Sequence, residues 1–160
     1  MPDSRREAVT EFATVDPEGP EAAWCLERYY EELAARFVEA FDPASQPAPK
    51  RRDFSAPAGA FVVARRLEEI VGCGALKTLS PGVALVTRMW VRPRARRGGL
   101  GAAILETLEA RARELGIPSV RLDTNQVLSE AQALYRKHGY REVPRFTHHP
   151  HAHFWFEKKL

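Results

Sequence analysis

A glycine-rich turn, Arg96-Arg97-Gly98-Gly99-Leu100-Gly101, constrains this chain more than any other segment. It follows an apolar, β-branched run at residues 83–91 and precedes a helical pattern that ends near Leu115. A strand that enters a helix through glycines leaves backbone N–H groups unpaired at the helix N-terminus, where the helix dipole adds partial positive charge. Because glycine has no Cβ, a ligand can approach this backbone closely. The turn therefore predicts a site for a phosphate or pyrophosphate.

Arginines surround the turn, and we expect them to add mobile positive charge there: Arg92, Arg94, Arg96 and Arg97. A simpler interpretation stays open, in which glycine only permits a tight strand-to-helix connection, because glycine-rich turns alone are weak signals. No Gly-Lys-Ser/Thr follows at the spacing of a nucleotide-binding P-loop. The third glycine of the dinucleotide-binding fingerprint is also missing.

The length of 160 residues and the hydrophobic content of 44% predict one soluble domain spanning residues 1–160. No run is long enough to cross a membrane, and residues 1–7 lack the apolar stretch of a secretory signal. Cys25 and Cys73 are far apart and have no paired neighbours, so we expect a reducing, cytoplasmic location. The net charge of +3 is mild, and a local phosphate site accounts for it at least as well as nucleic-acid binding does.

Hydrophobic periodicity predicts the order β-α-β-β-β-α-β-α-β-β, an α/β sheet of mixed direction with helices on its faces. The proline-rich segment 42–59 has no usable periodicity, so we expect it to be disordered or part of a site. Residues 129–132 have the spacing of a capping box, and Gly139 and Gly116 are predicted to end helices. The expected strands lie at residues 8–15, 61–64, 71–76, 83–91, 119–124, 140–143 and 154–160. The expected helices begin at Glu21, Leu100 and Ser129, and the first stops before Asp42.

Two motifs together resemble the acetyl-CoA-binding segments of the GNAT superfamily of N-acetyltransferases. The first is Arg96-x-x-Gly99-x-Gly101 after Met89-Trp90-Val91-Arg92-Pro93. The second is Leu122-Asp123-Thr124-Asn125 followed by Ala131-x-x-Leu134-Tyr135-x-Lys137-x-Gly139-Tyr140. The resemblance covers nearly the whole chain and implies a mostly antiparallel sheet of about seven strands, splayed between strands four and five.

The resemblance implies that the turn binds the pyrophosphate of coenzyme A (CoA) and that the splayed fourth strand pairs with the pantetheine arm. The family's first basic or amide residue is here Arg96, but Gly98 and Ala102 stand where relatives often have a basic residue, so the turn relies more on its backbone. A backbone N–H of the fourth strand would also polarise the thioester carbonyl. The implied cofactor-binding residues are Met89, Trp90, Val91, Arg96, Arg97, Gly98, Gly99, Leu100, Gly101, Ala102, Asn125 and Tyr135.

Tyr135 is the implied catalytic residue, since a tyrosine at this position in the family protonates the departing CoA thiolate. Helical spacing alone favours a core tyrosine, whereas the resemblance favours the functional role. Asn125 is either a turn former at the end of a strand or, as the resemblance implies, a contact of the pantetheine arm.

The general base is where the chain departs from its relatives. Many relatives carry a glutamate in the fourth strand where this chain has Leu85. The remaining candidates are Glu31, Glu32, Asp123, the histidines and an ordered water, and spacing does not choose among them.

The segment His148-His149-Pro150-His151-Ala152-His153 raises the question of a metal site, because alternate histidines of an extended segment share a face. No Cys, Asp or Glu lies within it and a proline interrupts it, so we expect no metal and instead a loop beside the acceptor pocket. Lys50-Arg51-Arg52 is expected to be solvated rather than to bind nucleic acid.

The sequence thus predicts an acetyl-CoA-dependent N-acetyltransferase that transfers an acetyl group to a primary amine by direct attack in a ternary complex. The acceptor would be a small molecule or a peptide, without nucleic-acid or membrane partners, and exposed strand edges make a homodimer reasonable. The alternative is a CoA-binding or regulatory module of the same fold with weak or no catalysis, which the absent glutamate at position 85 motivates.

Overall fold

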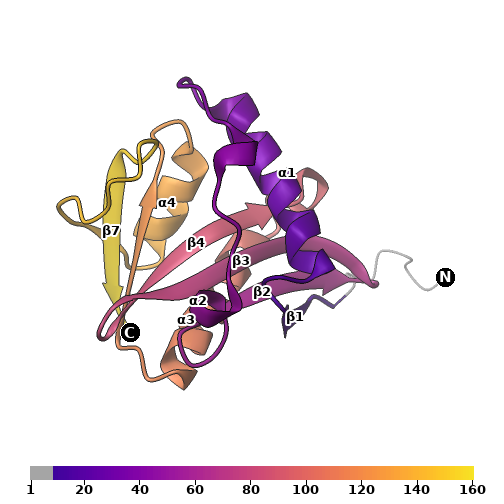
Figure 1. The fold of residues 1–160 in the computed structure, drawn as a ribbon, viewed down its shortest axis with the longest axis horizontal. Coiled ribbons are helices and arrows are strands. Elements are labelled where there is room, and N and C mark those ends of the chain that lie inside the picture. Colours follow the sequence, from indigo (N-terminus) through magenta and orange to yellow (C-terminus); the bar gives the residue numbers. More distant parts are fainter. Residues whose placement is uncertain (1–8) are drawn as a thin grey trace.

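The computed structural model describes residues 9–160, and within them the chain forms one seven-stranded sheet flanked by helices (Figure 1). The predicted absence of a secretory signal concerns residues 1–7, which lie outside this range. The elements are β1 (Glu11–Thr14), α1 (Pro20–Arg36), η1 (Pro43–Ser45), α2 (Arg51–Phe54), β2 (Gly59–Arg66), β3 (Glu69–Ser80), β4 (Val83–Val91), η2 (Pro93–Ala95), α3 (Leu100–Glu114), β5 (Ser119–Thr124), α4 (Ser129–Lys137), β6 (Arg141–Glu142) and β7 (Phe154–Lys159).

The strand order across the sheet is β1-β2-β3-β4-β5-β7-β6, and every neighbouring pair is antiparallel except β4 and β5. The predicted mixed, mostly antiparallel sheet is confirmed. β4 pairs with β5 only over residues 83–85, which face residues 119–121. Beyond Leu85 the two strands separate, so the expected splay between the fourth and fifth strands is also confirmed.

Helices cover both faces of the sheet, and each face has its own core. Val62 and Val63 are neighbours in β2, yet both are fully buried because successive strand residues point to opposite faces. Val62 belongs to the core beneath α3, where Ile104 is fully buried, and Val63 belongs to the core beneath α1, where Cys25 is fully buried. None of the helices within residues 9–160 is long and apolar enough to cross a membrane.

The first helix is shorter than its sequence pattern indicates. α1 ends at Arg36, and Phe37 is extended with φ −71° and ψ 140°. The expectation that helical spacing continues to Phe41 was therefore wrong. The rings of Phe37 and Phe41 instead pack against His151, each with a centroid distance of 5.2 Å. Contact with a distant segment, rather than helical periodicity, keeps both phenylalanines on the same side.

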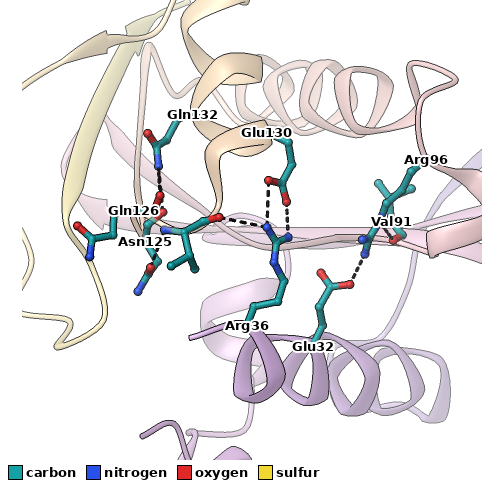
Figure 2. A network of polar contacts seen from close by, with 9 residues as sticks. Glu32, Arg36, Val91, Arg96, Asn125, Gln126, Glu130 and Gln132 are labelled. Atoms are coloured by element: carbon teal, nitrogen blue, oxygen red, sulfur yellow. Dashed lines mark hydrogen bonds and ion pairs between the residues drawn. The ribbon is translucent and has the colours of Figure 1, made fainter. Parts of the chain in front are cut away.

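The predicted capping box at the start of α4 does not form. Leu128 is the N-cap residue of α4, and no side chain caps this end. The Gln132 side chain donates instead to the carbonyl oxygens of Asn125 and Gln126, both at 3.1 Å (Figure 2). In a capping box the Gln132 side chain would bind the N-terminus of its own helix; here it binds the loop after β5 instead.

Candidate active site

β4 contains a bulge at the point where it has parted from β5. Cys73 of β3 faces Trp90, whereas Ala75 faces Thr87, so β4 has one extra residue between these pairs. Arg88 lies in this bulge and has a φ of +55°. A bulge bends its strand and redirects side chains, and a left-handed conformation is uncommon for arginine. The bulge thus sets the direction of the Arg88 side chain.

A cavity of about 510 Å³ lies where β4 and β5 diverge. Both strands line it, together with the C-terminal part of α1, residues 40–47, α4 and residues 149–152. The segment 42–59, expected to be disordered or part of a site, forms η1 and α2 and contributes Asp42, Ser45, Gln46 and Pro47 to the cavity wall. The predicted site residues that line the cavity are Met89, Asn125 and Tyr135.

The turn before α3 presents its backbone at the helix N-terminus. Arg97 and Gly99 have φ values of +69° and +80°, both left-handed. Gly99 is the N-cap residue, and no side chain caps α3. A Cβ at Gly99 would meet nothing within 4 Å, whereas Leu100 is buried and anchors the first helical turn in the core. The first N–H groups of α3 are thus directed to open space above an anchored turn, an arrangement suited to an anion.

Three of the four arginines around this turn form ion pairs, whereas the sequence predicted free positive charge from all four. Arg92 and Arg94 both form ion pairs with Glu69, the second at 2.8 Å. Arg96 pairs with Glu32 of α1, and its Nε donates to the Val91 carbonyl at 2.9 Å (Figure 2). Carboxylates far away in the sequence hold these three side chains. Within residues 9–160, Arg97 alone of the four has no carboxylate partner within 4 Å.

The last two turns of α1 join both sides of the splay. Glu32 contacts Arg96, which follows β4, and Arg36 contacts Glu130, which begins α4 beyond β5 (Figure 2). Arg36 also donates to the Val127 carbonyl at 3.1 Å. We call these two ion pairs the α1 clamp. The hydrogen bond that Arg36 donates to Glu130 lowers the pKa of Glu130 and raises the pKa of Arg36.

Tyr135 lies at the boundary between core and cavity, so both interpretations of this residue describe part of its position. The residue is 8% exposed and packs near Tyr140 and Phe156, with ring centroids 5.9 and 6.0 Å away. It also lines the cavity. Burial, with smaller contributions from the negative charges of Asp123 and Glu130, raises the pKa of Tyr135 well above its usual range. Its hydroxyl therefore keeps its proton at neutral pH.

Asn125 uses both ends of its side-chain amide within the protein. The amide nitrogen donates to the His151 carbonyl at 2.8 Å, and the amide oxygen accepts from the Val127 N–H at 3.0 Å. The residue is 2% exposed and connects the end of β5 to the histidine-rich segment. These contacts match its interpretation as a turn former, and its contact with the pantetheine arm stays a prediction.

The three strand residues assigned to the cofactor have different surroundings. Trp90 is buried beneath α1, with its ring 5.9 Å from that of Trp24. Met89 lines the cavity and packs against the opposite core. The Val91 carbonyl accepts the hydrogen bond from Arg96 described above. Because this half of β4 has no pairing with β5, its backbone groups on that side, apart from the Val91 carbonyl that Arg96 occupies, are available to a ligand.

A chain of polar contacts around Asp123 was not assembled by sequence reasoning. Its Oδ2 lies 2.7 Å from both the Thr147 hydroxyl and Nδ1 of His149. The Trp155 indole in turn donates to the Thr147 hydroxyl at 2.9 Å. The hydrogen bond that Nδ1 of His149 makes to the Asp123 carboxylate is the main reason that the pKa of His149 is raised. Asp123 and His149 both line the cavity, whereas a sequence separation of 26 residues conceals their contact.

The other candidates for the general base are placed less favourably. Leu85 lines the cavity, so the position of the glutamate in relatives is apolar here. Glu32 is engaged by Arg96, and Glu31 is exposed on α1 and absent from the cavity wall. Asp123 and His149 both line the cavity and contact each other, whereas His151, which also lines it, packs against Phe37.

The alternating histidines do not share one face. His149 contacts Asp123, His151 stacks on Phe37, and His153 accepts a hydrogen bond from the Gln126 N–H at 3.0 Å. A turn at residues 150–151 breaks the extended conformation that a common face requires. The segment instead forms one wall of the cavity, as expected of a loop beside a pocket.

Comparison with known families gives a match over residues 26–140 to the model described as the acetyltransferase (GNAT) family. The protein belongs to the GNAT family. The resemblance of its two motifs is therefore confirmed, and the splay, the bulge and the glycine turn lie in the matched region.

Similar proteins include one named "IAA acetyltransferase" from Azospirillum brasilense, which is 42% identical over 81 residues. That match covers 50% of this chain, and the chain spans about half, 53%, of that relative.

Solved structures show the same fold. A GNAT-family acetyltransferase from Staphylococcus aureus Mu50 has a TM-score of 0.82 at 19% identity, covering 94% of this chain and 99% of its own. The PaiA N-acetyltransferase from Thermoplasma acidophilum, in complex with coenzyme A, has a TM-score of 0.71 at 17% identity, covering 95% and 99%.

Proposed function

We propose that residues 1–160 act as one domain that transfers an acetyl group from acetyl-CoA to a primary amine. The observation that carries this proposal is the cavity at the splay. The walls of this cavity contain an unpaired strand edge, the Tyr135 side chain and the Asp123–His149 pair. Family membership and a structural relative in complex with coenzyme A support the choice of donor.

The donor would be held mainly by backbone groups. The turn before α3 fits a pyrophosphate because Gly99 leaves the helix N-terminus open and no side chain occupies the cap position. Arg97 adds a positive charge at this point, and the edge of β4 from Val86 to Val91, apart from the Val91 carbonyl bound by Arg96, can pair with an extended amide chain. Bound there, acetyl-CoA would supply an activated acetyl group as a thioester.

Tyr135 would serve as the acid. Its Oη holds a proton at neutral pH, as a phenol ordinarily does, and Tyr135 lies on α4 at the cavity wall. A phenol can give its proton to a sulfur that develops negative charge within hydrogen-bond reach.

The Asp123–His149 pair would serve as the base for the acceptor. The carboxylate beside Nδ1 holds the imidazole proton at that nitrogen, so Nε2 is left to accept a proton. Most primary amines are protonated at neutral pH and must lose a proton before attack. The pair thus supplies the function that the glutamate of relatives would have, from β5 and the histidine segment instead of from β4.

The decisive experiment is release of free thiol from acetyl-CoA in the presence of a panel of amines, measured for the natural protein and Tyr135→Phe. We expect Tyr135→Phe to lower kcat roughly 100-fold while the Kd for CoA stays nearly constant. Tyr140→Phe is the matched control. The Tyr140 hydroxyl donates to the buried Glu109 carboxylate at 2.8 Å, and Tyr140 does not line the cavity. That change should lower thermal stability and leave kcat of the folded protein nearly unchanged.

Two outcomes would contradict the proposal. Equal losses of kcat and CoA affinity in Tyr135→Phe would remove the acid role. Tight CoA binding without thiol release for any amine would favour the CoA-binding module that Leu85 motivates.

A further inference from the structure

Two cations on the cavity wall lack carboxylate partners of the kind that pair with most arginines around the glycine turn. Arg88 of β4 and Lys77 of β3 both line the cavity. Neither has a carboxylate within 4 Å in the part of the chain that the structure describes. By contrast, Arg92, Arg94 and Arg96 are all paired. Positive charge without a carboxylate partner inside a pocket is costly unless a ligand or water accompanies it, so its position indicates where an anionic group of a ligand could bind.

Neutral groups hold Arg88 in place. Its Nε donates to the Tyr30 hydroxyl at 3.2 Å and one terminal nitrogen donates to the Pro47 carbonyl at 3.4 Å. Its guanidinium carbon lies 4.8 Å from the centre of the Phe54 ring. These contacts orient the guanidinium but leave its charge intact and several of its five N–H groups unused. The bulge with φ +55° at Arg88 directs the side chain towards this position.

The acidic groups on the wall do not cancel this charge. Asp123 is engaged by His149 and Thr147. Asp42 is exposed and accepts the Ala44 N–H at 3.0 Å, where it caps η1. Four aromatic side chains also line the cavity, Tyr29, Tyr30, Phe37 and Phe41, and Tyr30 contacts Arg88 directly.

We propose, on the basis of the proposed function, that the acceptor amine also carries an anionic group, a carboxylate, which Arg88 and Lys77 bind. An arginine fork matches a carboxylate through two parallel hydrogen bonds. The aromatic wall suits an apolar body between amine and carboxylate. The acceptor class is therefore an amino acid or an aminomethyl-aromatic acid, rather than a plain alkylamine or polyamine.

The proposed base lies within the electrostatic field of both cations. Asp123 has the largest influence on His149 and raises its pKa, and the charges of Lys77 and Arg88 oppose that rise. An acceptor bound with its amine at His149 can therefore place its carboxylate at the cations in the same cavity. This juxtaposition on one wall distinguishes the site from a general amine pocket.

Matched pairs of acceptors test the proposal without any substitution. The probes are 4-(aminomethyl)benzoate with 4-(aminomethyl)benzamide, and L-phenylalanine with L-phenylalaninamide. We expect kcat/KM to be at least about tenfold higher for each acid than for its amide, the size of one charge-assisted hydrogen bond. The lower amine pKa of the amino-acid amide favours the amide chemically, so an acid preference there is a stringent result.

Substitutions then assign the preference to the cations. Arg88→Gln should bring the acid-to-amide ratio close to one, and Lys77→Gln should reduce it by a smaller factor. Arg28→Gln is the matched control, because Arg28 likewise binds a backbone carbonyl, that of Trp24 at 2.8 Å, and stacks on an aromatic ring outside the cavity. Its ratio should match that of the natural protein. A purely structural Arg88 would lower activity with acids and amides equally.

The proposal is overturned if the natural protein acetylates the amides as well as the acids, or if Arg88→Gln preserves the ratio. Should Arg88→Gln not fold, an acid-to-amide ratio in Lys77→Gln equal to that of the natural protein overturns it. Efficient acetylation of neutral amines would contradict only this inference, whereas failure with every amine would contradict the proposed function itself.

Discussion

The two sides of the cavity handle charge in opposite ways. On the side of the glycine turn, two carboxylates, Glu69 and Glu32, pair with three of the four arginines, and no side chain caps the N-terminus of α3. On the side of the histidine segment, Arg88 and Lys77 keep their charge, and an Asp–His pair lies beside them. Backbone N–H groups suit an invariant ligand such as a pyrophosphate, while side chains can be exchanged to choose among acceptors. We therefore infer a general donor side and a selective acceptor side.

The α1 clamp connects these sides. Glu32 reaches the turn beyond β4, and Arg36 reaches α4 beyond β5 (Figure 2). The clamp crosses the splay where hydrogen bonds between β4 and β5 have ended. It thereby links the glycine turn and the start of α4 to one helix.

The largest expected effect is a loss of activity from a substitution on the acceptor side alone. His149→Gln should lower kcat/KM by roughly 100-fold or more, because it removes the nitrogen that accepts the proton. His148→Gln is the control, since His148 is exposed one residue away and is not on the cavity wall. CoA affinity, measured by calorimetry, should be unchanged in both variants. A loss of CoA affinity in His149→Gln would contradict the separation of the two sides.

The pH profile provides a second measurement on the same pair. Only the neutral imidazole can accept a proton, so kcat/KM should rise as pH passes the raised pKa of His149. Asp123→Asn removes the main cause of that rise, so the ascending limb should move to lower pH even though the maximum is smaller. An ascending limb that stays at the same pH in Asp123→Asn would exclude His149 as the base.

The next largest expected effect is a loss of CoA affinity from a substitution on the donor side. Gly99→Ala and Gly116→Ala place a Cβ at similar left-handed φ values, +80° and +73°, at opposite ends of α3, and neither Cβ meets an atom within 4 Å. Both should lower the free energy of unfolding by about 1–2 kcal/mol, measured by urea denaturation. Only Gly99→Ala should weaken CoA binding, by roughly tenfold, since it obstructs the approach to the helix N-terminus. Equal CoA affinities in the two variants would argue against the turn as the anion site.

The smallest effect would sharpen the role of side chains on the donor side. Arg97→Gln should weaken CoA binding by roughly two- to fivefold at low ionic strength, and the difference should shrink as salt is added. Arg94→Gln should change CoA affinity less, because Glu69 already compensates Arg94. Titration of both variants at two salt concentrations measures this. A larger loss for Arg94→Gln would mean that its ion pair opens to bind the ligand.

Local sequence signals predicted elements best where one chain segment decides its own structure. The expected strand at residues 119–124 coincides with β5, because its alternation of buried and partly exposed residues needs no distant partner to be recognised. The helix ends at Gly116 and Gly139 were also predicted, since both glycines take left-handed conformations there. The end of α1 and the capping of α4 were not, because Phe37 and Gln132 bind residues of other segments.

The sequence by itself determined the family, the strand–glycine–helix turn and the order of elements, because these depend on local patterns of apolar residues and glycines. Only the tertiary structure decided which charges are paired, since Glu32 meets Arg96, and Glu69 meets Arg94, across long sequence separations. It likewise decided which residues could replace the glutamate absent at Leu85, by bringing Asp123 and His149 within 2.7 Å. A charge in a sequence has no partner until folding supplies one, and the reactivity of a side chain depends on that partner.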